Sequence, residues 1–347
     1  MRLGYGEPVN VTRVNILNLG LILVALAATM VVPFELFLLA YAILGPLHYL
    51  TEISWLHDRK YFSPGKLDWL PLWALGIAGA LFLPGVFGAE PLVLQIPGAP
   101  AGLSEWSYDF AFLGFGLALV FVPTRNWIVR VAWLLLLFEV LRRYRSNGLF
   151  IKSFAVYLPS LVHVFVFTGV FMLWGALKGR SRSGYLTFAV FLAAGAAAWF
   201  APGVELVQIS SWAKANFVAP FQSLARSVMF DFGGLSGEEA YRVSLFDHPS
   251  AIAAVRFFGF AYTYHYLNWF SKTSVIKWHE IPASRILLIV VLWLVSVGLY
   301  LFDYGLGLSW LFALSFAHVV LEFPLNHRSF YGVAEEFKRR LVKREPA

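Results

Sequence analysis

Runs of about 20 apolar residues recur along the whole chain, and they constrain its fold more than any other feature. A helix of about 20 residues is long enough to cross the hydrocarbon core of a bilayer. Only 14% of the 347 residues are charged and 59% are hydrophobic, whereas about a quarter of a soluble domain is charged. Because a backbone in lipid must satisfy its own hydrogen bonds, the sequence predicts an all-α, polytopic membrane helix bundle.

We expect about ten transmembrane helices (range eight to ten) in a single domain over residues 1–347. The expected spans are 14–32, 34–56, 69–87, 110–122, 127–140, 150–177, 185–200, 251–270, 286–302 and 306–323. The longest connection, 202–249, is predicted to be an outer-side loop. Within it Phe217, Phe221, Leu224 and Val228 recur at helical spacing, which indicates a helix that lies in the membrane interface.

Positive charge predicts the orientation of the bundle. Lysine and arginine follow the second, sixth, eighth and last spans, and such residues favour the cytoplasmic side. We therefore expect cytoplasmic N- and C-termini in an inner membrane of the bacterial type, with 328–347 as a basic cytoplasmic tail. The net charge of +7 indicates contact with anionic lipid at the basic loops rather than nucleic-acid binding. One cluster, Arg142, Arg143 and Arg145, would lie on the outer side and departs from this rule.

A His-x-x-x-Glu pattern occurs twice. His48 and Glu52 lie near the end of the second span, and His318 and Glu322 lie near the end of the last. Residues four apart project from one face of a helix. An ungapped alignment of the two segments also pairs His57 with His327, and Tyr61 with Tyr331. The chain has no cysteine, so thiolate ligation is excluded.

Four histidines fall in even-numbered spans, which all run from the outer to the inner side: His48, His163, His265 and His318. They are expected at a similar depth in the inner half of the membrane. Imidazole is the commonest metal ligand, and ionisable residues inside a membrane are functional candidates by default. We predict that these four residues bind metal, with Glu52 and Glu322 as ligands or as groups that orient the imidazoles.

Five further residues are weaker candidates. His57, His279 and His327 follow three of these spans at the inner side and are additional candidate ligands. Asn268 and Trp269 share the helix face of His265, so we expect them to shape a substrate pocket.

Short segments resemble the bacterial membrane carotene dioxygenases of the Brp/Blh type. Gly45-Pro46-Leu47-His48, with Glu52 after it, is similar to the Gly/Pro-His motif of that family, and His163, His265 and His318 follow in the family's order. The resemblance covers four short segments. It implies iron held by histidines and an apolar polyene substrate that is cleaved to retinal.

These observations favour an enzyme, a non-haem iron oxygenase or desaturase-like oxidoreductase that acts on a lipid, isoprenoid or carotenoid. One or two iron ions and dioxygen are its expected cofactor and co-substrate, and the need for an electron-donor protein is left open by the sequence. Two alternatives remain open at this point. Paired histidines can hold haem in an electron-transfer subunit, and a His/Glu set can relay protons in a transporter.

Overall fold

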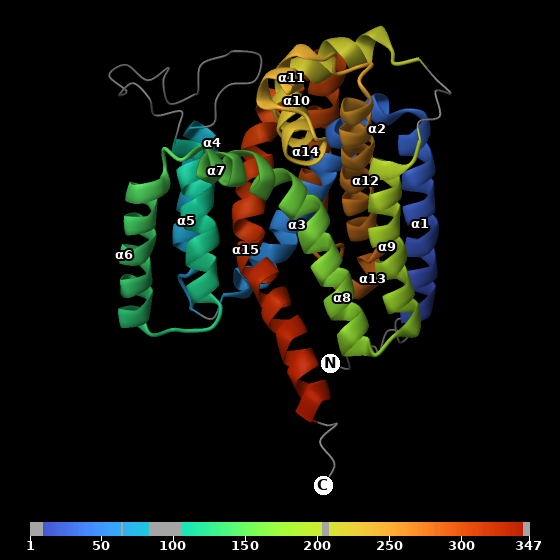
Figure 1. The fold of residues 1–347 in the computed structure, drawn as a ribbon. Helices are drawn as coiled ribbons and strands as arrows, with labels where there is room; N and C mark the ends of the chain where they lie inside the picture. Colours follow the sequence, from blue (N-terminus) through green and yellow to red (C-terminus); the bar gives the residue numbers. More distant parts are fainter. Residues whose placement is uncertain (1–9, 64, 83–105, 203–207, 343–347) are drawn as a thin grey trace.

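The structure is a computed structural model, and it describes residues 10–63, 65–82, 106–202 and 208–342. All regular secondary structure in these ranges is helical, as expected (Figure 1). The elements are α1 (Val11–Val31), α2 (Pro33–Leu39), η1 (Ala40–Leu44), α3 (Gly45–Asp58), η2 (Lys60–Phe62), α4 (Trp69–Phe82), α5 (Trp106–Phe121), α6 (Trp127–Tyr144), α7 (Gly148–Ile151), η6 (Lys152–Phe167), α8 (Thr168–Gly179), α9 (Arg182–Phe200), α10 (Ser211–Phe232), α11 (Gly237–Arg242), α12 (Pro249–Ser271), α13 (Thr273–Ile276), α14 (Ala283–Phe302) and α15 (Tyr304–Val342).

Six continuous helices in the described residues are long and apolar enough to cross a membrane. They are Val11–Val31, Pro33–Asp58, Gly148–Gly179, Arg182–Phe200, Ala283–Phe302 and Tyr304–Leu341. The other four expected spans are also helical, as α4, α5, α6 and α12, but they do not meet that criterion. Residues 83–87 of the third expected span lie outside the described residues.

Large apolar side chains cover the outer surfaces of several of these helices. On α14, Leu287, Leu294 and Leu301 are more than half exposed, and on α6 so are Ile128 and Leu135. Such extensive apolar exposure indicates contact with lipid rather than with water.

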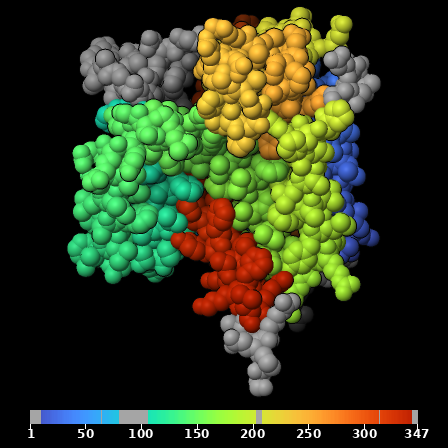
Figure 2. Space-filling model, in the orientation of Figure 1, coloured from blue at the N-terminus to red at the C-terminus, as the bar shows by residue number. Residues whose placement is uncertain are grey.

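The helix expected at the membrane interface is α10. It crosses one end of the bundle, and together with α11 it covers that end (Figures 1 and 2). Its apolar face packs on protein, because the rings of Phe217 and Phe221 lie 4.9 and 4.7 Å from those of Phe34 and Phe37 in α2. The periodicity thus predicted the helix correctly. Its apolar face, however, packs mainly on α2 and α12.

The last helix is longer than the expected span. α15 continues as one helix from Tyr304 to Val342 and extends beyond the other helices (Figure 1). Residues 328–342, expected as a basic tail, are therefore part of this helix. The first residues of α1 and the last of α15 lie at the same end of the bundle (Figure 1).

The arginine cluster that departs from the charge rule is paired with carboxylates. Arg142 and Arg143 both contact Glu139, at 2.8 and 2.5 Å. Arg145 contacts Asp109 at the start of α5, at 2.8 Å. These ion pairs give the three arginines structural partners, whereas the count of lysines and arginines at this end of the bundle still departs from the charge rule.

Two of the helices that carry the candidate ligands contain wide, π-helical turns. The turns are η1, which ends four residues before His48, and η6, which contains both Pro159 and His163. Wide turns inside α-helices occur frequently at functional sites. Here the wide turns lie just before His48 and around His163, so they change the direction in which these two side chains project from their helices.

Candidate metal centre

The four histidines that were expected in membrane spans form a closed ring in the core of the bundle. His48 comes from α3, His163 from η6, His265 from α12 and His318 from α15. Each residue is between 1% and 8% exposed. Consecutive imidazole centroids around the ring are separated by 4.7 Å (His48–His265), 5.0 Å (His265–His163), 4.9 Å (His163–His318) and 5.5 Å (His318–His48).

The imidazole nitrogens approach each other closely in two pairs. Nε2 of His48 lies 3.0 Å from Nε2 of His265, and Nε2 of His163 lies 3.0 Å from Nε2 of His318. With metal–nitrogen distances of ~2.1 Å, two ligands at a right angle on one ion are about 3.0 Å apart, whereas two tetrahedral ligands are about 3.4 Å apart. The spacing suits a single ion with near-octahedral geometry. It also suits a hydrogen bond between two neutral imidazoles.

The two glutamates join the ring in different ways. Oε2 of Glu52 lies 3.0 Å from Nε2 of His48 on its own helix. Oε2 of Glu322 lies 3.1 Å from Nδ1 of His163, which belongs to another helix. Both side chains are almost completely buried. Ligand atoms of His48, His163 and His265 lie within 4.8 Å of one another, as do those of His48, Glu52 and His318.

Several buried polar atoms of the ring form no hydrogen bond of normal geometry with the described residues, although the two glutamate oxygens lie 3.0 and 3.1 Å from an imidazole nitrogen. They are Nδ1 of His48, His163 and His318, and Oε2 of Glu52 and Glu322. A buried polar atom without a partner costs about 1–3 kcal/mol. Nitrogen and carboxylate donors facing one another in this way fit a cation, because a metal ion accepts lone pairs from both kinds of ligand.

Residues around the ring hold the imidazoles in place. Oγ1 of Thr168, the first residue of α8, lies 2.8 Å from Nδ1 of His265, so Nε2 of that imidazole faces the ring. The ring of Tyr49 stacks on His318 at a centroid distance of 4.1 Å. The hydroxyl of Tyr49 is 2.7 Å from that of Tyr266. The sequence analysis did not identify these three residues, since nothing in their spacing separates them from ordinary helix-packing residues.

The three additional candidate histidines lie outside this ring. His57 is exposed, and its Nδ1 is 3.3 Å from the Tyr61 hydroxyl. His279 is exposed after α13. His327 is buried, with Nε2 2.9 Å from the carbonyl oxygen of Phe115. The positions of all three are typical of structural or surface residues rather than of ligands to the same ion.

The two expected pocket residues occupy different surroundings. Trp269 packs edge-on against His48, at a centroid distance of 5.5 Å, and its Nε1 donates to Thr51. Asn268 lines a smaller cavity at the other side of α12. Neither residue is among the described residues that line the large cavity beside the ring.

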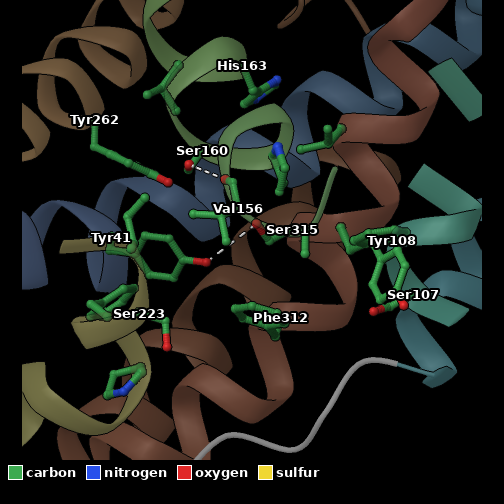
Figure 3. A pocket seen from close by; sticks show the side chains of 18 of the residues that line it. Tyr41, Ser107, Tyr108, Val156, Ser160, His163, Ser223, Tyr262, Phe312 and Ser315 are labelled. Carbon is green, nitrogen blue, oxygen red and sulfur yellow. Dashed lines mark hydrogen bonds between the residues drawn. The ribbon is translucent and has the colours of Figure 1, made fainter. Parts of the chain in front are cut away.

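That large cavity has a volume of about 830 Å³ and reaches His163 and His318. Tyr41 and Tyr262 lie on one side of it and Tyr108 on the other, with Ser315 near the Tyr41 hydroxyl (Figure 3). One wall is formed by the wide turns of η6 and another by residues 219–224 of α10. Its size is within the range of small-molecule sites.

The cavity combines an apolar wall with a few hydroxyl groups and two imidazoles of the ring. Such a site would accept an apolar molecule and bring it to the ring. In comparisons with protein-family models, curated proteins and solved structures the chain has no match, so the geometry of the ring and of its cavity is the basis for interpreting this site.

Proposed function

We propose that the protein is an integral membrane oxidoreductase that holds non-haem iron and oxidises an apolar substrate with dioxygen. The observation that carries the proposal is the closed ring of four buried imidazoles with two glutamates, next to a cavity of about 830 Å³. His48, His163, His265 and His318 would hold the metal. Glu52 and Glu322 would complete the ligand set or orient the imidazoles. Bound iron would supply the activation of dioxygen.

The choice of iron rests on the donor set and on its spacing. Imidazole and carboxylate together suit iron, and an octahedral ion held by the four imidazoles alone would keep two positions open, with the glutamates orienting the imidazoles. The 3.0 Å separation of the nitrogens in two pairs is compatible with an octahedral ion, as it is with hydrogen bonds between neutral imidazoles. Because the four imidazoles form one ring, we propose a single ion rather than two.

The substrate would enter the large cavity as an extended apolar chain. Its walls are largely aromatic and aliphatic, including Phe154, Phe312 and Phe316, so an apolar chain would displace water from them. The hydroxyls of Tyr41 and Tyr262 would position an oxygen-bearing group where the substrate has one. A lipid, an isoprenoid or a carotenoid would meet these requirements, and the resemblance to the Brp/Blh family makes a carotenoid the first substrate to assay.

The proposal includes a membrane topology with more than the six crossings already described. α12 would also cross the membrane, because it is 23 residues long and brings His265 to the same ring as the ligands from three of those six helices. α4, α5 and α6 would complete about ten crossings. The start of α1 and the end of α15 would then face the cytoplasm, where basic loops favour contact with anionic lipid.

The geometry speaks against the two alternatives. A haem with two axial histidines needs their nitrogens on opposite faces of a flat ring, about 4 Å apart across the iron. The 3.0 Å pairs leave no room for it. A transporter with helices broken at its site is disfavoured because the backbones of Pro33–Asp58 and Gly148–Gly179 continue through their ligand positions.

Metal analysis of the purified protein, together with its visible spectrum, tests the proposal. We expect about one iron per chain, no haem absorption band, and consumption of dioxygen only when an apolar substrate is present. A comparison with and without a reductant would show whether an electron donor is required. Protein that is folded and monodisperse but binds no iron on reconstitution would overturn the proposal, and a haem spectrum would replace it with the electron-transfer alternative.

A further inference from the structure

A second cavity lies at the end of the bundle where α1 begins and α15 ends, apart from the histidine ring. Its volume is about 300 Å³. It is bounded by the first turns of α1, by the last turns of α8 and α12, by the start of α9 and by α13. None of the ring histidines and neither ring glutamate is among its described lining residues.

Two lysines line this cavity without an acidic neighbour. Lys178 is exposed at the end of α8, and Lys272 is partly buried directly after α12. No aspartate or glutamate occurs among the described lining residues. Burial lowers the pKa of the Lys272 ammonium to about 8, as expected of a cation that burial deprives of water without a compensating carboxylate. An anionic group in the cavity would supply that missing partner.

The rest of the lining combines a polar patch with an apolar wall. Asn268 is 8% exposed, and its carboxamide oxygen has no hydrogen-bond partner among the described residues. Asn15 and Thr187 add further polar groups, and Phe171 and Met172 form part of the wall. The cavity therefore presents two cations to one end of a ligand and an apolar surface to the other, and the Asn268 oxygen can accept a hydrogen bond from a lysine ammonium or from a hydroxyl of the head group.

We infer that this cavity binds an anionic amphiphile, with its carboxylate or phosphate head between Lys178 and Lys272 and its acyl chain against Phe171 and Met172. A volume of about 300 Å³ accommodates a head group and part of a single chain. The remainder of the chain would extend into the bilayer. The basic residues Arg180 and Arg182 lie next to it in sequence and would raise the local concentration of anionic lipid.

Binding of radiolabelled palmitate to the full-length protein in an uncharged detergent tests this inference. We expect Lys178→Ala and Lys272→Ala each to weaken binding about 10-fold, as the loss of a charge-assisted contact implies. Lys272→Arg should retain most of it. The matched control is Lys277→Ala, because Lys277 is exposed, pairs with Glu280 at 2.9 Å and is not a lining residue. Iron content should be unchanged in the Lys178 variant, so the result is independent of the proposed oxidase function.

Competition identifies the source of the head group. Displacement of palmitate by phosphatidylglycerol, but not by phosphatidylcholine, would point to a membrane phospholipid, whereas displacement only by free fatty acids would point to a carboxylate ligand. Either result supports the inference. Equal competition by hexadecanol, which lacks the charge, would overturn it. Wild-type affinity in the Lys178 variant would also overturn it. Because Lys178 is exposed, misfolding would be an inadequate explanation for a loss of binding in that variant.

Discussion

The two helices that carry His-x-x-x-Glu use the same spacing in different ways. In α3, Glu52 contacts His48 of its own helix, whereas in α15 Glu322 contacts His163 of a neighbouring helix. The flanking residues differ even more. His57 is exposed and Tyr61 is buried, whereas the aligned His327 is buried and Tyr331 is exposed.

The difference arises where each helix ends. α3 stops at Asp58, and the backbone then takes three residues with positive φ, Lys60 to Phe62, which turn Tyr61 back into the core. α15 instead continues as a helix through the corresponding positions. A repeated pattern thus predicts which residues share a helix face, but the surrounding helices decide what that face contacts.

Loss of any ring histidine should have the largest effect. We expect His48→Ala and His318→Ala, one from each helix, to lower metal affinity at least 10–100-fold, as should His163→Ala and His265→Ala. Ligands of one ion act as a unit, so the His48/His318 double variant should lose little more than either single one. Metal per chain is the measurement, with His248→Ala as control, because His248 precedes the first residue of α12 and is not part of the ring. Full occupancy in two of the four variants would contradict a single site.

The glutamates should show a smaller and unequal effect. Glu52→Gln and Glu322→Gln should each lower metal affinity by about 10-fold, because a neutral amide is a weaker ligand and a weaker orienting group. Only Glu322→Gln should also lower the thermal midpoint of the metal-free protein, since Glu322 joins α15 to η6. Metal titration and melting curves of both variants would test this. Identical behaviour of the two would remove the distinction between the helices.

Loss of a hydroxyl that contacts an imidazole should weaken metal binding more than loss of a hydroxyl that acts through a tryptophan. Thr168→Val removes the contact with Nδ1 of His265 and should weaken metal binding several-fold. Thr51→Val removes only the acceptor of Trp269 Nε1 and should change metal affinity less than 2-fold. Both variants preserve side-chain shape. The reverse order of effects would show that the packing of Trp269 on His48 controls the site.

Substitution of the two aligned histidines outside the ring should change the free energy of unfolding to different extents and leave metal binding unchanged. His327→Gln should lower the free energy of unfolding by about 1–3 kcal/mol, because it disturbs a buried hydrogen bond to Phe115. His57→Gln should have little effect, since His57 is exposed. Metal content should remain at the wild-type level in both. A loss of metal in either variant would restore that histidine as a candidate ligand.

The sequence predicted the helical fold, and it selected the four histidines that the structure brings together, because both depend on local spacing; their binding of metal stays a prediction. The length of an apolar run locates a helix. A histidine inside such a run is costly to bury, so it is a candidate for a functional role. The partner of Glu322, the burial of α10 and the contribution of Thr168 depended on which helices pack together, and residue spacing contains no such information. The number of membrane crossings was the part of the fold that the sequence determined least. Short helices such as α5 have the apolar composition of a span but not its length.

The wide turns of η6 also have a consequence for insertions and deletions. Each residue of an α-helix rotates the chain by about 100°, and a π-type turn holds one residue more than an α-type turn. Removing one residue between Lys152 and His163 would rotate His163 by about 100° relative to the preceding α7, except where a wide turn tightens to an α-type turn and absorbs the deletion. A single inserted or deleted codon in this segment can therefore turn His163 away from the ring without changing any of the six candidate ligand residues.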